Sequence, residues 1–272
     1  PDGSGRYTYT LAGSNNTSHA VVVDADVRVV RSVEGTSGAD TLDQSNATAG
    51  VSLSGGAGDD TVTAGTGADT LMGGAGDDVL SGGSGIDTVD YSSSTNPIAI
   101  TLNGSGAGTA VDGATGTGST GTDTLTGIEN VVGGAGADTI TAGATDNLLS
   151  GGAGNDSIDA GGGADTLVGG AGADTLLGGA GNDTLLGGTG SDSLVGGDGT
   201  DTVDYSAAKG KLVVNLNTGT ASDDGVNGEG VDTLASIENV IGSVNDDQIT
   251  GTSVANTLQG GTGDDTLDGN GG

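Results

Sequence analysis

A repeat of nine residues, copied in tandem in one register, constrains this chain more than any other feature. Residues 133–204 hold eight consecutive units that follow, with local departures, the rule GGxGxDxUx, in which U is a large aliphatic residue. Self-similarity at a fixed period is typical of solenoids, in which each repeat stacks on its neighbours. The U residues are Ile140, Leu149, Ile158, Leu167, Leu176, Leu185, Leu194 and Val203.

Each unit predicts a turn followed by a short strand. Glycines at positions one, two and four permit backbone conformations that a Cβ would disfavour, which suits a tight turn. Side chains alternate across a strand, so U points to one face and its two neighbours point to the other. Two units would close a flattened coil of eighteen residues with the U side chains inside. Stacked coils would then pair strands eighteen residues apart, in parallel, at about 4.8 Å.

The aspartate at position six creates an electrostatic problem for such a stack. Carboxylates in each row would lie about 5 Å apart, and each adjacent pair would repel by about 3 kcal/mol at an effective dielectric constant near 20. Residues 133–204 contain no Lys or Arg to neutralise the rows. A hard divalent cation between coils would do so, and carboxylate with carbonyl oxygens in a flexible loop favours Ca²⁺ over Mg²⁺. One edge carries Asp138, Asp156, Asp174 and Asp192, and the other carries Asn147, Asp165, Asp183 and Asp201.

The tandem units resemble the nonapeptides of the RTX (repeats-in-toxin) family. The resemblance implies an all-β fold, a right-handed parallel β-roll or β-solenoid with several bound Ca²⁺ ions. It also implies that each ion takes positions two, four and six of one turn and positions one, three and six of the turn eighteen residues later. Positions one to four would contribute main-chain carbonyl oxygens.

Carried over to residues 55–90, this scheme joins Gly56, Gly58 and Asp60 with Gly73, Ala75 and Asp78, and Gly65, Gly67 and Asp69 with Gly82, Ser84 and Asp87. Along the first edge of residues 133–204 the scheme gives three ions. The first joins Gly134, Gly136 and Asp138 with Gly151, Ala153 and Asp156. The second joins Gly152, Gly154 and Asp156 with Gly169, Ala171 and Asp174, and the third joins Gly170, Gly172 and Asp174 with Gly187, Thr189 and Asp192. Along the second edge it joins Gly161, Gly163 and Asp165 with Gly178, Ala180 and Asp183, then Gly179, Gly181 and Asp183 with Gly196, Asp198 and Asp201. The last pair joins Ser243, Asn245 and Asp247 with Gly260, Thr262 and Asp265.

Three turns depart from the rule. Asp40 precedes the clean register by two residues more than the repeat allows. Asn147 and Asn256 stand where the rule has aspartate, which weakens the ion sites expected beside them.

Composition agrees with a thin core supported by ions. The 272 residues include 60 glycines, 4 tyrosines and no Phe, Trp or Cys, and the formal net charge is −32. Low hydrophobicity with high charge favours disorder, so we expect the chain to be unfolded without Ca²⁺. The acidity argues against nucleic-acid partners, which need basic contacts to phosphate. No stretch approaches the length of a membrane span.

The sequence predicts six regions. Residues 1–34 alternate with period two, as in strands, and form either the end of an Ig/cadherin-like module or a cap on the roll. Residues 91–132 and 205–241 are two similar inserts, each beginning within a DTVDYS motif (residues 87–92 and 201–206) and closing with IENV, that we interpret as β-rich caps using Tyr91 and Tyr205. The arrays are residues 35–90, 133–204 and 242–272, and the last stops inside a repeat, so we expect the parent protein to continue.

We predict no enzymatic activity, because His19 is the single histidine and no catalytic constellation surrounds it. The resemblance implies a secreted or cell-surface bacterial protein exported by type I secretion, with a structural or adhesive role as an adhesin, S-layer or matrix protein. Alternatives are the non-catalytic carrier region of a toxin or secreted hydrolase, and an ice-binding solenoid. Outward aliphatic residues at position nine would pack either on an insert or on another subunit; they are Val168, Leu177, Leu186 and Val195. Cell-surface or matrix partners are also expected.

Overall fold

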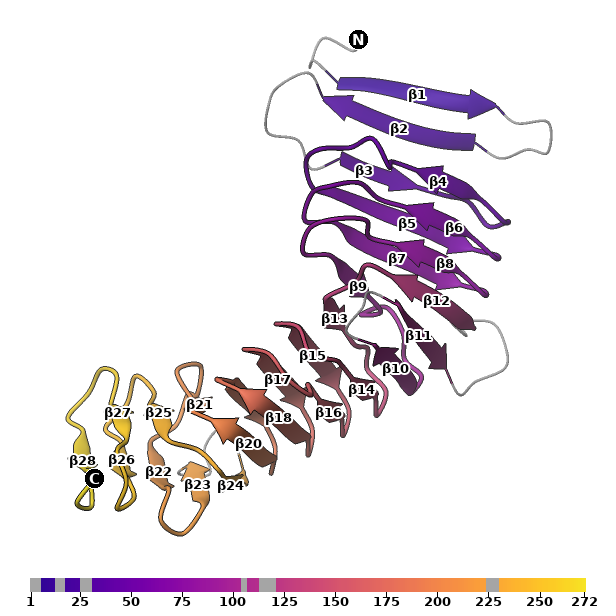
Figure 1. The fold of residues 1–272 in the computed structure, drawn as a ribbon. Helices are drawn as coiled ribbons and strands as arrows, with labels where there is room; N and C mark the ends of the chain where they lie inside the picture. The colour runs from indigo at the N-terminus through magenta and orange to yellow at the C-terminus, as the bar shows by residue number, and fades with distance from the viewer. Residues whose placement is uncertain (1–5, 13–17, 25–30, 104–106, 113–120, 224–229) are drawn as a thin grey trace. The chain divides into compact units, whose positions relative to one another are not determined.

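The computed structural model describes residues 6–12, 18–24, 31–103, 107–112, 121–223 and 230–272. These residues form strands and turns, arranged as a parallel β-solenoid (Figure 1), which confirms the predicted fold class. Among them there is no helix long and apolar enough to cross a membrane. The chain divides into two compact units, Pro1–Val132 and Gly133–Gly272.

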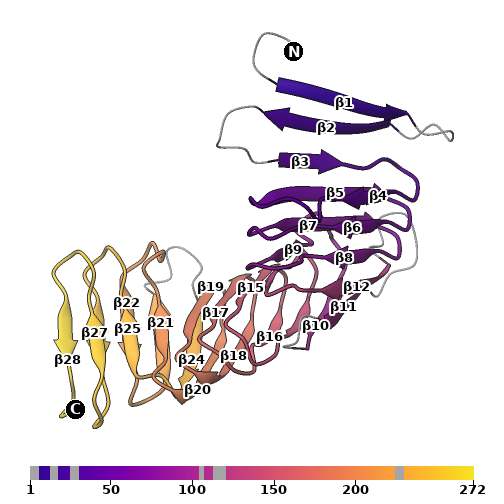
Figure 2. The same cartoon turned by 45° about the horizontal axis from the view of Figure 1, so that its top comes forward.

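The N-terminal unit has two sheets that face each other across the coil (Figure 2). One sheet has the order β1-β2-β3-β5-β7-β9-β13, and the other has the order β10-β11-β12-β8-β6-β4. The first contains β1 (Arg6–Ala12), β2 (Ser18–Asp24), β3 (Arg31–Glu34), β5 (Val51–Ala57), β7 (Thr70–Ala75), β9 (Thr88–Asp90) and β13 (Asn130–Val132). The second contains β4 (Thr41–Asp43), β6 (Thr61–Thr63), β8 (Val79–Ser81), β10 (Ile98–Leu102), β11 (Ala107–Asp112) and β12 (Thr122–Thr126).

The first two strands form an antiparallel hairpin, and β3 lies in the same sheet between this hairpin and the parallel coils. β2 pairs with β3 in antiparallel fashion, and β3 pairs with β5 in parallel fashion with Arg31 opposite Val51. Strands β1 and β2 lie within residues 1–34, where period-two alternation predicts strands, whereas residues 25–30 lie outside the described part. The hairpin continues the solenoid sheet. Both interpretations of residues 1–34, the end of an Ig/cadherin-like module and a cap on the roll, stay predictions.

The C-terminal unit repeats this architecture. One sheet has the order β15-β17-β19-β21-β25-β27, and the other has the order β14-β16-β18-β20-β24-β23-β22-β26-β28. The first contains β15 (Leu148–Ala153), β17 (Thr166–Ala171), β19 (Thr184–Thr189), β21 (Thr202–Asp204), β25 (Asn239–Ile241) and β27 (Thr257–Gln259). The second contains β14 (Thr139–Thr141), β16 (Ser157–Asp159), β18 (Thr175–Gly181), β20 (Ser193–Gly199), β22 (Leu212–Asn215), β23 (Thr220–Asp223), β24 (Val231–Ala235), β26 (Gln248–Thr250) and β28 (Thr266–Asp268).

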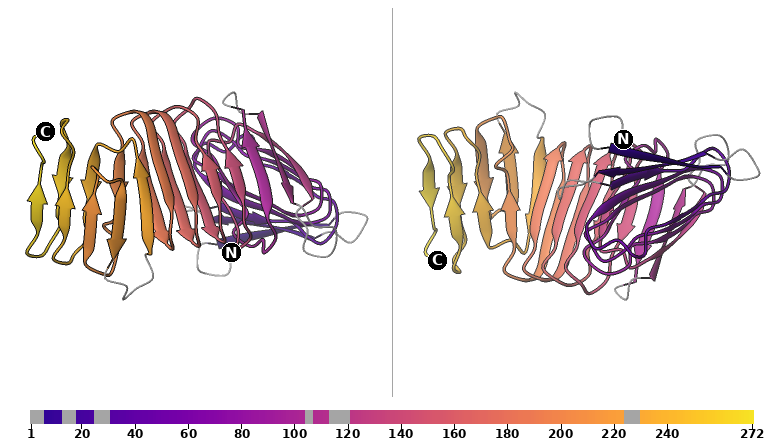
Figure 3. Two further views of the ribbon diagram at one scale, coloured as in Figure 1. Left: turned by 90° about the horizontal axis from the view of Figure 1, so that it is seen from below. Right: turned by 90° about the horizontal axis from the view of Figure 1, so that it is seen from above.

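Strand pairing in this unit follows the predicted spacing of eighteen residues. Leu149 lies opposite Leu167, which lies opposite Leu185 in the next coil, and all three pairs of strands from β15 to β21 are parallel. On the other side Ile158 lies opposite Leu176 and then Leu194. Each coil is thus two nonapeptides, and Figure 3 shows the strands of successive coils of this unit side by side.

The core is a single file of aliphatic side chains between the two sheets. Every U residue from Ile140 to Val203 is at most 1% exposed, as are Val62, Leu71, Leu80 and Val89 in the first array. Position nine faces outward as expected, and Leu177 is 37% exposed. A core one side chain thick buries little apolar surface per residue, so its stability depends strongly on what happens in the turns.

Each insert is a short antiparallel excursion that returns to the coil register. In the first insert β10 pairs with β11 and β11 with β12, both antiparallel, after which β12 runs parallel to β8 and β13 runs parallel to β9. In the second, β22, β23 and β24 do the same, ending with β24 parallel to β20 and β25 parallel to β21. The closing segment of each insert is therefore itself a coil of the solenoid.

Candidate metal centre

Aspartates at position six form hydrogen-bonded rows along both edges of the coils. In each row the main-chain N–H of one aspartate donates to the Oδ1 atom of the aspartate in the next coil. Asp156 donates to Asp174 and Asp174 donates to Asp192, each at 2.8 Å. On the other edge Asp165 donates to Asp183 at 2.8 Å, and Asp183 donates to Asp201 at 2.9 Å. One oxygen of each of these carboxylates, Oδ1, therefore accepts a hydrogen bond that keeps successive coils in register.

The other carboxylate oxygen, Oδ2, is the chemically informative atom. In eight of these aspartates Oδ2 is buried and has no hydrogen-bond partner in the described part of the chain. They are Asp60, Asp78, Asp87, Asp156, Asp165, Asp174, Asp183 and Asp201. Leaving a buried charged oxygen unsatisfied costs several kcal/mol, so native structures pair such groups or bind a metal there.

Two of the atoms that the predicted ligand scheme assigns to one ion lie close together beside the position-one glycines, and the scheme itself stays a prediction. A Cβ built on Gly169, at position one, would collide with Asp174 Oδ2 of its own turn and with the Gly187 carbonyl oxygen of the next coil. The same two kinds of atom meet at Gly178, which lies against Asp183 Oδ2 and the Gly196 carbonyl oxygen. The carboxylate of one turn and the position-one carbonyl of the next are thus brought together beside these two glycines.

Carbonyl oxygens at positions two and four point toward the following coil. The Gly152 carbonyl oxygen lies against Gly170, and the Gly154 carbonyl oxygen lies against Gly172. Both receiving glycines have φ values in the left-handed region, 112° and 135°, which a side chain would strain. Some of these carbonyls also accept a main-chain hydrogen bond, as Gly134 does from Ala153 at 2.9 Å, but each carbonyl oxygen has a second lone pair.

Burial shifts the acid–base equilibrium of the row. It raises the pKa of Asp78, Asp87 and Asp156 to about 6 and that of Asp165 to about 7, against the lowering effect of the main-chain hydrogen bond that each receives. The pKa values of Asp60, Asp174, Asp183 and Asp201 are also raised by burial. No Lys or Arg of the described residues is among the causes of these pKa shifts, and neighbouring carboxylates raise several of them further.

The donor set fits calcium. In the described residues no three His, Cys, Asp or Glu side chains converge on one point, so an ion here would need main-chain oxygens as well as carboxylates. An all-oxygen set of carboxylates and carbonyls in glycine turns is the chemistry that Ca²⁺ prefers. When bound, the ion would supply positive charge to two aspartates of successive coils. The chain supplies the spacing, the left-handed glycines and the buried oxygens.

Each insert brings an aspartate into the row that the repeat rule does not identify. Asp78 donates its N–H to Asp123 Oδ1 at 3.0 Å, and Asp192 donates to Asp232 Oδ1 at 2.9 Å. Asp123 and Asp232 were missed because they lie 45 and 40 residues beyond their partners instead of eighteen. The available signal was the GxDTL ending shared by both inserts and by the nonapeptides.

A tyrosine hydroxyl takes the second oxygen of each of these aspartates. Tyr91 donates to Asp123 Oδ2, and Tyr205 donates to Asp232 Oδ2, both at 2.7 Å. Both rings are buried, and burial together with the nearby Asp123 charge raises the pKa of Tyr91, so its hydroxyl keeps the proton that it donates. Burial likewise raises the pKa of Asp123 to about 7. The tyrosines predicted to cover a roll end thus also close one carboxylate row.

In the other row of each insert, a glutamate takes the place of the aspartate of the next coil. Asp87 donates its N–H to Glu129 Oε2, and Asp201 donates to Glu238 Oε2, both at 2.9 Å. The nonapeptide rule does not identify either glutamate as part of a row. Each ends a turn of three residues, residues 127–129 (GIE) or 236–238 (SIE), where the rule has six residues. The repetition of IENV in both inserts was the only signal.

Two of the three departures from the repeat rule, Asp40 and Asn147, keep the row hydrogen bond, as the regular Asp247 does, whereas the third makes a different one. Asp40 donates its N–H to Asp60 Oδ1 at 2.7 Å, which places it at the head of its row despite the two extra residues. Asn147 donates to Asp165 Oδ1 at 2.7 Å, and Asp247 donates to Asp265 Oδ1 at 2.9 Å. Asn256 instead donates its side-chain Nδ2 to the Glu238 carbonyl oxygen at 2.9 Å. The side-chain amide of Asn256 can donate to the Glu238 carbonyl oxygen, whereas the carboxylate of an aspartate at this position would have no proton to donate.

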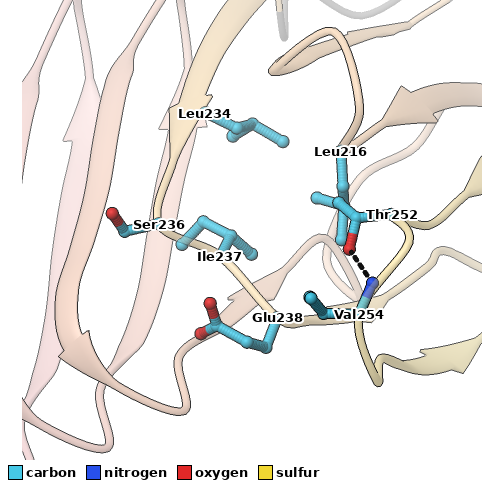
Figure 4. A pocket seen from close by; sticks show the side chains of 7 residues that line it. All are labelled: Leu216, Leu234, Ser236, Ile237, Glu238, Thr252 and Val254. Carbon is cyan, nitrogen blue, oxygen red and sulfur yellow. Dashed lines mark hydrogen bonds between the residues drawn. The ribbon is translucent and has the colours of Figure 1, made fainter. Parts of the chain in front are cut away.

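A shallow pocket lies beside the second short turn (Figure 4). Leu216, Leu234, Ile237 and Val254 give it an apolar lining, with Ser236, Glu238 and Thr252 at its margin. The Glu238 carboxylate is turned away from Thr252, toward the coil of Asp201 that it accepts from. The pocket therefore presents no convergent polar groups, and the chemistry of this region remains in the carboxylate rows.

A comparison with models of known families shows to which family the chain belongs. The family model described as RTX calcium-binding nonapeptide repeat (4 copies) matches residues 54–89, 123–158, 132–167, 143–176, 177–207 and 241–272, which together cover more than half of the chain. The chain belongs to the RTX family. RTX repeats bind calcium, and RTX solenoids are typically structural, non-catalytic regions of proteins that are usually secreted by the type I route. No curated protein matches the chain.

Proposed function

We propose that this RTX chain is a region that calcium folds, within a secreted bacterial extracellular protein with a structural or adhesive role. The observation that carries the proposal is the row of buried, unpartnered Oδ2 atoms in successive coils. Extracellular calcium modules bind at about 10⁻⁴ to 10⁻³ M, far above cytosolic calcium. The chain would thus stay unfolded inside the cell and fold once outside, where binding free energy becomes folding free energy.

The test is a calcium titration followed by far-UV circular dichroism, with Mg²⁺ as the control ion. We expect a cooperative gain of β signal near millimolar Ca²⁺ and little change with Mg²⁺, which demands a smaller and more regular octahedral site. A chain that is fully folded in a calcium chelator and unchanged by Ca²⁺ would exclude the proposal.

An adhesive or structural role is supported by the outward aliphatic residues of the central array. Val168 lies opposite Leu186 on one sheet, and Leu177 lies opposite Val195 on the other, so each face presents an in-register aliphatic pair. Such surfaces suit lateral contact with another solenoid or with a matrix. Light scattering of the calcium-loaded chain tests this: we expect association that rises with concentration and weakens in Leu177→Thr, whereas a monomer at all concentrations would argue against self-association.

A further inference from the structure

The short turns that end the two inserts repeat the contacts of the calcium turns. In a regular turn, the position-one glycine lies against Oδ2 of its own aspartate and the position-one carbonyl oxygen of the next coil. Gly82 lies in the same way against Asp87 Oδ2, with the Gly127 carbonyl oxygen in the place of the next coil. Gly127 therefore acts as position one of a coil turn that the nonapeptide rule does not recognise.

The second insert shows the same arrangement independently. Gly196 lies against Asp201 Oδ2 and the Ser236 carbonyl oxygen. Gly127 and Ser236 both have left-handed backbones, with φ values of 61° and 52°. For Ser236 this conformation is unfavourable, since a Cβ crowds the following carbonyl oxygen. The two short turns differ in sequence, but each places a position-one carbonyl oxygen beside the aspartate of the preceding coil.

The carboxylate that completes a site is also present. Glu129 and Glu238 accept the N–H of Asp87 and Asp201, the interaction that every regular coil makes with an aspartate. The short turn has three residues where the regular one has six, and glutamate is longer than aspartate by one methylene. The longer side chain brings a carboxylate to the row from a main chain that has been shortened.

The atom that points to an ion is Oδ2 of the preceding aspartate. Asp87 and Asp201 are both 0% exposed. Their Oδ2 atoms have no hydrogen-bond partner among the described residues. On the parallel row the tyrosine hydroxyls satisfy the last carboxylate, but they do not reach these two oxygens, which face the short turn.

We propose that each insert ends in a further calcium site, formed between the regular turn of Asp87 and the short turn of Glu129, and again between the turns of Asp201 and Glu238. The ligands in the first are Asp87 Oδ2, the Gly127 carbonyl oxygen, the Glu129 carboxylate and the position-two carbonyl of Gly83, which lies against Gly127. In the second they are Asp201, Ser236, Glu238 and the corresponding carbonyl of Gly197. This inference rests on the proposed calcium function and extends it to turns without the nonapeptide motif.

The experiment counts bound calcium by equilibrium dialysis of the full chain at saturating Ca²⁺. Glu129→Gln and Glu238→Gln keep an oxygen that accepts the aspartate N–H but remove the charge, so each should lower the count by one ion and the double variant by two. Asp159→Asn removes one charge from an exposed outward position and should leave the count unchanged. Far-UV circular dichroism at saturating Ca²⁺ verifies that each variant is folded.

Two further variants make the result decisive. Glu238→Asp keeps the charge but withdraws the carboxylate by one carbon–carbon bond, and should lose the same ion as Glu238→Gln. Asp174→Asn, in a regular coil, should lower the count whether or not the short turns bind. An unchanged count in both glutamine variants, with a loss in Asp174→Asn, would overturn this inference and leave the proposed function intact. An unchanged count in Asp174→Asn as well would overturn both.

Discussion

The regular coils and the coils closed by an insert treat the same buried carboxylate differently. In the regular coil of Asp174, one oxygen accepts an N–H from the preceding coil and the other has no hydrogen-bond partner among the residues that the structure describes. In the coil of Asp232, one oxygen accepts the N–H of Asp192 and the other accepts the Tyr205 hydroxyl. The comparison teaches that the tyrosine of an insert satisfies a buried carboxylate oxygen of the kind that the coil of Asp174 leaves without a partner among the described residues.

Removing a carboxylate from the middle of a regular row should have the largest effect. Asp174→Ala removes a ligand that would contact two successive ions, and it deletes the acceptor of the Asp156 N–H. We expect the calcium concentration at the folding midpoint to rise at least about tenfold, which corresponds to about 1.4 kcal/mol. A calcium titration by circular dichroism measures this, with the exposed Asp159→Ala as control; equal midpoints would remove the basis for the row assignment.

Removing a tyrosine hydroxyl should destabilise the insert end without changing the ion count. Tyr205→Phe leaves the buried Asp232 Oδ2 without its donor, which should lower the free energy of unfolding by about 1–3 kcal/mol. Urea unfolding at saturating Ca²⁺ measures it. Adding Asp232→Asn should recover part of the loss, because the amide oxygen still accepts from Asp192 and the charge is gone. A gain of one ion in Tyr205→Phe would erase the distinction between the two kinds of coil.

Acid should make the regular coils behave more like the insert ends, because a proton replaces the ion. Burial raises the pKa values of Asp78, Asp87 and Asp156 to about 6, whereas the ordinary value is 3.8. The folded state then binds protons more tightly than the unfolded state. The resulting stabilisation is full below the ordinary pKa and is lost as pH rises through about 6.

This linkage gives two measurable consequences. Without calcium, the largely unfolded chain should recover more β signal at about pH 5 than at about pH 7.5, because protonation of the buried carboxyls favours the folded state. In the presence of Ca²⁺, protons compete for the same oxygens, so the folding midpoint should move to higher calcium as pH falls. Far-UV circular dichroism without calcium and calcium titrations at both pH values test this, and a calcium-free chain with less β signal at the lower pH contradicts it.

The smallest effect is expected at the strained residue of the second short turn. Ser236 has a φ of 52°, which glycine adopts without penalty, as Gly127 does at the equivalent place. Ser236→Gly should therefore raise the free energy of unfolding, by at most about 1 kcal/mol, since glycine also gains freedom in the unfolded state. Gly127→Ser is the matched reverse change and should destabilise. Opposite signs would show that the two short turns are not equivalent.

The sequence predicted the coil, the inward aliphatic residues and the spacing of eighteen, because a strict period fixes all three together. Leu149, Leu167 and Leu185 lie opposite one another as that spacing requires. It did not predict the partners of Asp123, Asp232, Glu129 and Glu238, because an excursion of unknown length separates each from the coil on which it stacks. Periodicity identifies neighbours at a constant offset, whereas the inserts restore the register through strand pairing that only the structure reveals.

The conversion of eighteen residues into one coil has a mechanical consequence. Fully extended, eighteen residues span about 60 Å, whereas one coil adds only about 4.8 Å along the stack. A coil that opens under tension therefore lengthens the protein by roughly 55 Å. Because its carboxylates hold the coil to the next one through Asp Oδ1 atoms, coils should open one after another from a free end, and the chain would act as an extensible tether whose length responds to the surrounding calcium.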